Sequence, residues 1–227
     1  MKIKFATLAL LAAILPGTIL AQNNDKFYSG DKNNPFTQED KKFNDWAISA
    51  GVGVPLVQSA DLTSIKNGNG KNLFGYSAYL SVDKAITHAF GLNLQYEMGE
   101  TKQGMVNLKK DAGLGARTQY QALSLLGDIN FSNLLRRSDN HSPFRWALHG
   151  YAGVGTLGYK AYRQDADPLN PNNKLGEKLI TDVQFLKKLS LFGQAGAGLK
   201  FNVNRRIDIE GRLMYVVTGD DNFDGGD

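Results

Sequence analysis

The chain contains no cysteine, which excludes disulfide bridges, thiolate chemistry and a lipid anchor attached through cysteine. Histidine is also scarce, at three residues. His149 has no second candidate metal ligand or nucleophile at a useful spacing in the sequence. We therefore predict no catalytic residue, no metal site and no cofactor, and we expect that the protein is not an enzyme.

Long hydrophobic runs are missing as well. Beyond the first 21 residues no stretch approaches 18 consecutive apolar residues, so no transmembrane helix is predicted. The formal net charge of +4 includes Lys2 and Lys4 and is too small to indicate a nucleic-acid partner. A mean hydropathy of -0.32 does not exclude a membrane protein, because strands that alternate apolar and polar residues average out.

The first 21 residues have the pattern of a secretory signal peptide. Lys2 and Lys4 precede the apolar run Phe5–Leu15, and small residues lead to a cleavage point between Ala21 and Gln22. The apolar run is too short to span a bilayer, which disfavours an N-terminal membrane helix. We predict a signal peptide over residues 1–21 and a polar leader over residues 22–44.

The dominant pattern from residue 45 to residue 227 is alternation with period two. In the clearest segment, 206–217, Ile207 and Leu213 belong to an apolar face and Asp208, Glu210 and Arg212 to the other. A soluble core does not accept three charges along one strand without partners. An apolar outer face and a polar inner face over about 10 residues are typical of a transmembrane β-strand.

Seven such segments are predicted as strands. They are Trp46–Val54, Leu73–Val82, His88–Met98, Arg117–Phe131, Arg145–Leu157, Leu189–Val203 and Arg206–Val217. The segment Glu177–Lys187 fits either a strand extension or a helical turn. Long connections alternate with shorter ones, as in bacterial outer-membrane barrels with a periplasmic N-terminus.

The fold class predicted from these strands is all-β, as an antiparallel up-and-down transmembrane β-barrel over residues 45–227. Bacterial barrels have an even number of strands, so seven strands predict an eight-stranded barrel whose closing strand is missing, and hence a C-terminally truncated chain.

The predicted inner face carries charges of both signs that must pair across a narrow barrel. The lumen-facing polar network comprises Glu97, Asp128, His149, Lys200, Asp208, Glu210 and Arg212. A catalytic cluster is the alternative, but structural pairing accounts for the same residues. An eight-stranded barrel leaves room for little besides its side chains, which predicts a plugged lumen.

Aromatic side chains recur near the ends of the predicted strands. The set consists of Trp46, Tyr76, Tyr96, Trp146 and Tyr215. Girdles of aromatic residues at the two membrane interfaces account for this placement. A ligand-stacking set is the alternative.

One segment near the end of the chain has the pattern of a calcium loop. Residues 220–225 read Asp-Asp-Asn-Phe-Asp-Gly, which fits the first half of an EF-hand loop. No helical pattern precedes it, and the twelfth-position carboxylate falls beyond Asp227. An acidic surface loop is the simpler interpretation.

Three segments carry a resemblance to a known family. They are Asp45–Ala47, Asn140–His149 (NHSPFRWALH) and Gly219–Gly226 (GDDNFDGG). With these segments the chain resembles the N-terminal barrel of OmpA-like outer-membrane proteins of the Bacteroidetes type. The resemblance implies an eight-stranded barrel, often followed by acidic calcium-binding repeats and a periplasmic peptidoglycan-binding domain that is not present in this sequence.

The function expected from this is a structural one. We expect a barrel in the bacterial outer membrane that contributes to envelope integrity and anchoring, touches peptidoglycan through a further domain, and presents loops for surface contacts. The alternative is a narrow porin-like channel for small solutes or ions. A lipid-modifying or proteolytic barrel enzyme and a soluble lipocalin-like barrel are weaker alternatives.

Overall fold

A computed structural model describes residues 6–11, 46–59, 62–65, 72–87, 89–105, 115–135, 146–167, 170–187, 190–203, 207–220 and 222–223. These residues form ten strands in one sheet and a single short helix, α1 (Phe131–Leu134). Every strand pairing is antiparallel, which confirms the all-β antiparallel prediction. Within the described part of the chain, no helix has the length and apolar character needed to cross a membrane.

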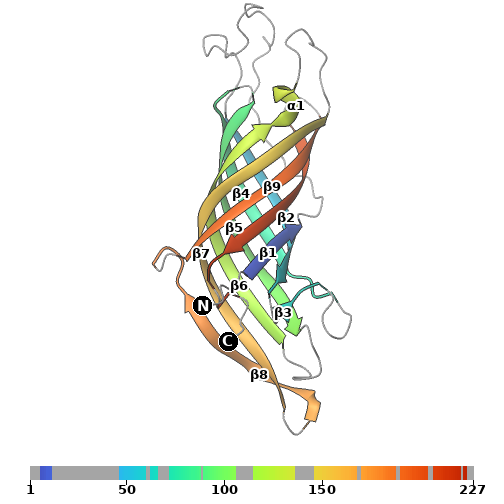
Figure 1. Cartoon of the computed structure of the whole chain (residues 1–227), viewed down its shortest axis with the longest axis vertical. Helices are drawn as coiled ribbons and strands as arrows, with labels where there is room; N and C mark the ends of the chain where they lie inside the picture. The colour runs from blue at the N-terminus through green and yellow to red at the C-terminus, as the bar shows by residue number, and fades with distance from the viewer. Residues whose placement is uncertain are drawn as a thin grey trace, which may run out of the picture.

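The strands pair in a closed circle. The strands are β1 (Ala6–Leu11), β2 (Trp46–Gln58), β3 (Leu62–Thr63), β4 (Tyr76–Ala85), β5 (Phe90–Met105), β6 (Gly115–Asn130), β7 (Trp146–Asp167), β8 (Asn170–Val183), β9 (Ser190–Asn202) and β10 (Asp208–Thr218). Going round the circle, the order is β1, β2, β4, β5, β6, β7, β9, β10 and again β1. Figure 1 shows these strands tilted around the long axis of the molecule.

Each of the seven predicted strands is present, and several are longer than predicted. The largest extension is in β7, which continues ten residues beyond Leu157 to Asp167. Up to Leu157, β7 pairs with β9; from Tyr159 onward it pairs with β8 instead. The β7–β8 hairpin therefore extends past the circle, at the end opposite α1 (Figure 1).

The strand β8 resolves the open question at Glu177–Lys187 in favour of a strand extension. It runs from Asn170 to Val183, followed by a turn over residues 185–187. Its first half was predicted as part of a long loop, because Pro171 and three asparagines dominate it and interrupt any period-two pattern. Register shifts along its pairing with β7 accommodate this irregular composition.

The closing position of the circle is occupied, so the predicted absence of a closing strand is wrong for this structure. β1 pairs with β10 over Ala6–Leu11 and with β2 over Thr7–Leu11. These residues lie inside the predicted signal peptide and are therefore not among the seven predicted strands. β2 and β10 would otherwise each present an unpaired edge, and a segment with free backbone groups satisfies both edges.

Alternate residues along the strands face opposite environments. On β5 the side chains of Leu92 and Leu94 are exposed, while those of Asn93 and Gln95 are buried. The same alternation, with apolar residues on the outer face, occurs on β2, β4, β6, β7, β9 and β10. The inner face therefore carries many polar side chains together with a cluster of buried apolar ones, among them Leu126, Phe192 and Met214, while large apolar side chains such as Leu94 are exposed outside.

Candidate functional site

Arg212 is at the centre of the polar network on the inner face. Its side chain donates to both carboxylate oxygens of Glu210, with Nε 3.2 Å from Oε1 and Nη2 3.0 Å from Oε2. Nη1 donates across the interior to Oε1 of Gln95 at 3.0 Å. The Tyr151 hydroxyl donates to Glu210 at 2.5 Å, and the guanidinium lies 4.1 Å from the centre of the Tyr151 ring. Every charge in this cluster is thus directly compensated.

A second cluster joins three of the predicted residues, again across different strands. His149 Nδ1 lies 2.7 Å from Oδ1 of Asp128, and Lys200 Nζ lies 3.8 Å from Oδ2 of the same carboxylate. All three side chains are at most 15% exposed. The arrangement pairs one carboxylate with a histidine and a lysine, which agrees with the expectation that His149 is a structural interior residue.

The remaining predicted network residues are placed differently. Glu97 does not hydrogen-bond a cation; its carboxylate accepts from the Tyr120 hydroxyl at 2.8 Å and from Gln95 Nε2 at 3.2 Å. Asp208 lies on the inner face at the start of β10 and is half-buried, and no hydrogen bond joins it to Glu97 or Glu210. Gln95 donates to Glu97 and accepts from Arg212, so it joins Glu97 to the Arg212 cluster. Lys200 forms an ion pair with Asp128 and also interacts electrostatically with Asp208 and Glu210, so the predicted residues form linked groups on the inner face.

Sequence reasoning missed several interior partners. Asp83 accepts from Ser49 Oγ at 2.7 Å and also from Asn93 Nδ2. Tyr151 and Gln95 complete the Arg212 cluster. Asp83 lies just beyond the predicted strand Leu73–Val82, although its alternation with Ser81 and Tyr79 on β4 places it on the inner face. Extending the predicted strand past Val82 would have identified Asp83 as an inner-face residue.

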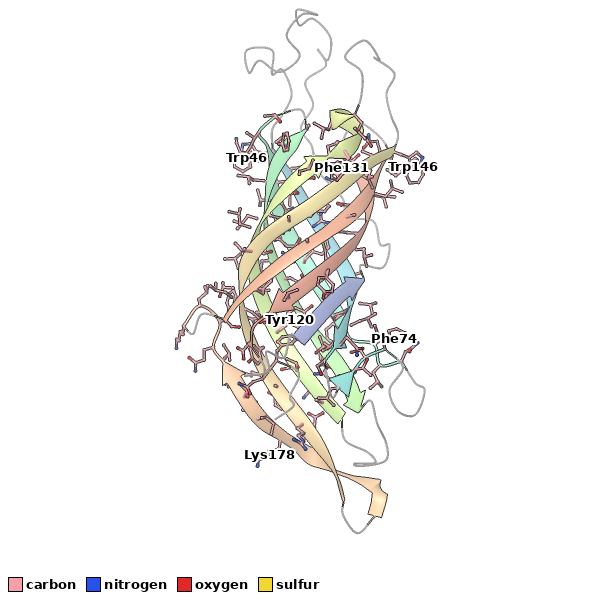
Figure 2. The ribbon with its side chains drawn as sticks, in the orientation of Figure 1. Trp46, Phe74, Tyr120, Phe131, Trp146 and Lys178 are labelled. Carbon is pink, nitrogen blue, oxygen red and sulfur yellow. The ribbon has the colours of Figure 1, made fainter. Side chains whose placement is uncertain are left out.

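The predicted interface aromatics all lie on the outer face, with different surroundings. Trp46 and Trp146 are half exposed at the same end of the circle as Phe131 (Figure 2). The Trp146 ring packs on Phe201 at 4.5 Å, and Lys84 Nζ lies 4.3 Å from the centre of the Trp46 ring.

The three tyrosines of the set are further from that end. Tyr76 and Tyr215 are exposed, whereas Tyr96 is partly covered by the Phe185 ring at a centroid distance of 6.1 Å. No two members of the aromatic set stack on one another in the described residues. This spread around the outer surface does not form a ligand-stacking pocket.

After β10, the side chain of Phe223 inserts into the interior. Phe223 is 1% exposed and packs edge-on against Tyr159 at 5.2 Å and Tyr120 at 6.2 Å. Its carbonyl accepts from the Thr118 hydroxyl at 2.8 Å. The predicted acidic surface loop is thus wrong at Phe223, because the aromatic ring is apolar enough to fill the interior between two tyrosines.

The calcium alternative falls largely on Asp221, Asp224 and Gly225, which lie outside the described residues. Among the described residues, no group of three or more histidine, cysteine, aspartate or glutamate side chains is placed to hold a metal ion.

A separate ionic group lies on the outer face, where β5, β6 and β8 extend past the apolar surface. Arg117 donates to Glu100 at 3.0 Å and to Glu177 at 2.6 Å, and Gln119 donates to Glu100 at 3.4 Å. Burial acts to raise the pKa of Glu100, but its hydrogen bonds from Arg117 and Gln119 outweigh this and lower the pKa. The hydrogen bonds that Arg117 donates to Glu177 and Glu100 raise the pKa of Arg117.

Comparisons with known proteins do not assign this arrangement to a family. The sequence matches no protein-family model, and no curated protein matches it either. The features that bear on function are thus the interior, where charged and polar side chains pair, and the outer face, where apolar side chains are exposed.

Proposed function

We propose that the protein is an integral β-barrel of the bacterial outer membrane with a structural role. The observation that carries this is the outer face of β5. Its exposed residues from Phe90 to Met98 are apolar, and the next two outward positions are Glu100 and Lys102. This span is nine residues long, the length at which a tilted strand crosses the hydrocarbon core.

The other strands of the circle support the same interpretation. On β9 the outer positions from Leu191 to Phe201 are apolar or small, and on β2 the outer positions from Trp46 to Leu56 are apolar. A water-soluble protein rarely exposes a continuous apolar surface of this extent. The tryptophans at one end and Tyr76 towards the other agree with aromatic girdles at two membrane interfaces.

The interior supports a structural role rather than transport. Arg212, Glu210 and Gln95 connect opposite walls, and Phe223 fills the space between Tyr120 and Tyr159. Side chains paired in this way hold the strands of a narrow barrel together. In the proposed mechanism, the exposed apolar side chains of the outer face form an apolar belt that partitions into lipid. The polar side chains of the inner face hold the strands together, and the loops contact the surroundings. Peptidoglycan anchoring would require a domain outside this sequence.

Carbonate extraction of membranes from cells that express the full chain tests this proposal. An integral barrel stays in the outer-membrane fraction, migrates faster on gels before heating than after it, and resists external protease in its strands. A soluble lipocalin-like barrel would wash off in carbonate, which would contradict the proposal.

The intact mass of the membrane-bound protein reports whether the predicted leader is removed. We expect Gln22 at the N-terminus of the exported protein, as the cleavage pattern predicts. Cleavage there also removes β1 and frees the facing edges of β2 and β10 for another strand. Retention of residues 6–11 in the membrane form would show instead that β1 belongs to the mature wall.

Conductance in planar bilayers separates the structural role from a channel. The paired interior predicts little or no single-channel current from the inserted protein. Phe223→Ala removes the ring between Tyr120 and Tyr159 but leaves the Arg212 cluster in place, so we expect its conductance to stay low as well. Stable, large openings of the unaltered protein would favour the narrow porin-like channel.

A further inference from the structure

A cavity of about 760 Å³ lies on the outer wall, where the β7–β8 hairpin returns towards the circle. Its floor is made by outward-facing residues of β4 to β7, including Tyr76, Met98 and Gln121. The turn after β8 covers one side and contributes Phe185 and Lys187. The volume is in the range of small-molecule binding pockets.

The covering turn is held closely against the wall. Gly158 faces outward on β7, and a Cβ atom there would lie 2.5 Å from the Phe185 Cα. The Phe185 ring packs edge-on against Tyr96 of β5. The next residue, Leu186, has φ of 61°, a left-handed conformation that costs a non-glycine residue of the order of 1 kcal/mol. Such strain persists only where neighbouring contacts hold the backbone in place.

The cavity lining combines apolar and basic side chains. Tyr76, Met98 and Phe185 continue the apolar outer belt. Lys160, Lys187 and Asp182 line the cavity on the side of the β7–β8 hairpin. Asp182 lies 3.6 Å from Lys160, and Lys187 has no ion-pair partner among the described residues. The cavity therefore presents net positive charge immediately beyond an apolar surface.

We infer that this cavity binds a bilayer lipid whose headgroup carries a net negative phosphate. This inference rests on the proposed function, because it places the apolar residues of the cavity lining at the edge of the hydrocarbon. An acyl chain would lie along Tyr76, Met98 and Phe185, and the phosphate would lie between Lys160 and Lys187. Basic pockets next to the apolar surface of membrane proteins recognise anionic headgroups in this way.

Native mass spectrometry of the purified full chain in detergent tests the inference. The probes are phosphatidylglycerol and phosphatidylcholine with identical acyl chains. We expect a preference for phosphatidylglycerol of roughly fivefold, the effect of about one unpaired lysine near a headgroup. The K160Q/K187Q double variant should lose the preference, because both cations that face the phosphate are removed.

Lys178→Gln is the matched control. Lys178 is exposed on β8, in the same hairpin but outside the cavity lining, and Figure 2 shows it partway along the hairpin. The control should keep the fivefold preference. Equal binding of the two lipids by the unaltered protein, or an equal loss in the control, would overturn the inference.

Gly158→Ala tests the cavity independently of charge. The added Cβ displaces the Phe185 backbone and the turn that covers the cavity, so binding of both lipids should fall. Full competition by inorganic phosphate would also contradict a lipid site, since it would indicate a site for the free anion. Only protein that resists carbonate extraction after reconstitution is scored. Failure to insert therefore counts against the proposed function, whereas insertion without lipid preference counts against this site alone.

Discussion

The inner and outer faces of the same strands show opposite chemistry. On β5, Asn93, Gln95 and Glu97 are buried inside the circle, while Leu92 and Leu94 are exposed outside it. A soluble sheet protein places its apolar face inward, because burial of apolar surface drives folding in water. This reversal is the basis of the proposal that the outer face lies in lipid, and it leaves pairing between polar groups to stabilise much of the inner face.

The inner face should be the more sensitive to a single substitution. Arg212→Met keeps the side-chain volume but leaves Glu210 without its guanidinium partner in a site where Arg212 is 5% exposed. We expect a loss of about 3–5 kcal/mol in the free energy of unfolding, the cost of one unpaired buried charge. Urea unfolding of the protein in detergent micelles measures it.

Two further variants define this effect. The double variant R212M/E210Q removes both charges and should recover a large part of the lost stability. Lys178→Met, on the exposed hairpin, should change the free energy of unfolding by less than about 0.5 kcal/mol. A loss below about 1 kcal/mol for Arg212→Met would show that the inner network contributes little.

The outer face should be the next most sensitive, and only inside the apolar belt. Leu94 is 50% exposed in the middle of the β5 span, so Leu94→Arg places a charge in hydrocarbon. We expect a loss of about 2–4 kcal/mol for protein folded in lipid vesicles. Leu135→Arg is the control, because Leu135 is 82% exposed but lies after α1, beyond the belt. Equal losses of stability for Leu94→Arg and Leu135→Arg would contradict the distinction between the apolar outer surface and the residues beyond it.

The ionic group of Arg117, Glu100 and Glu177 lies beyond the apolar part of the outer face. It should contribute least to the free energy of unfolding, and its contribution should depend on pH. Its hydrogen bonds lower the folded-state pKa of Glu100 below the unfolded value. The resulting stabilisation is present above the unfolded pKa and is lost as the pH falls through the folded pKa. We expect about 1 kcal/mol, since the group is next to solvent. Glu100→Gln should reduce the loss of stability at acidic pH, which a stability–pH curve measures. If that loss were unchanged, other carboxylates would be responsible for the pH dependence.

Much of the fold could be predicted because alternation is a local signal. Seven strands, their antiparallel order and the inward positions of Arg212, Asp128 and His149 follow from period two. The contacts between interior side chains could not be predicted, because the tilt and stagger of the strands decide which side chains face one another across the interior. Arg212 thus reaches Gln95, which is 117 residues earlier in the sequence, and Glu97 meets Tyr120 instead of a cation.

Two other regions were missed for different reasons. β8 contains a proline and three asparagines that obscure its pattern, and it pairs with the part of β7 that extends beyond β9. The insertion of Phe223 between Tyr120 and Tyr159 depends on a tertiary contact that no local pattern encodes. Residues 6–11 read as a signal peptide by composition, and their pairing with β2 and β10 reflects the two edges that the circle would otherwise leave open.

The central claim is that the outer face lies in lipid, and spin-label accessibility along β5 tests it most directly. The chain has no cysteine, so a single cysteine introduced at Leu92, Asn93, Leu94 or Gln95 gives one label at a known position. For protein in vesicles we predict high oxygen and low nickel-chelate accessibility at 92 and 94, and low accessibility to both reagents at 93 and 95. High nickel-chelate accessibility at 92 and 94 would place the outer face in water and contradict the account.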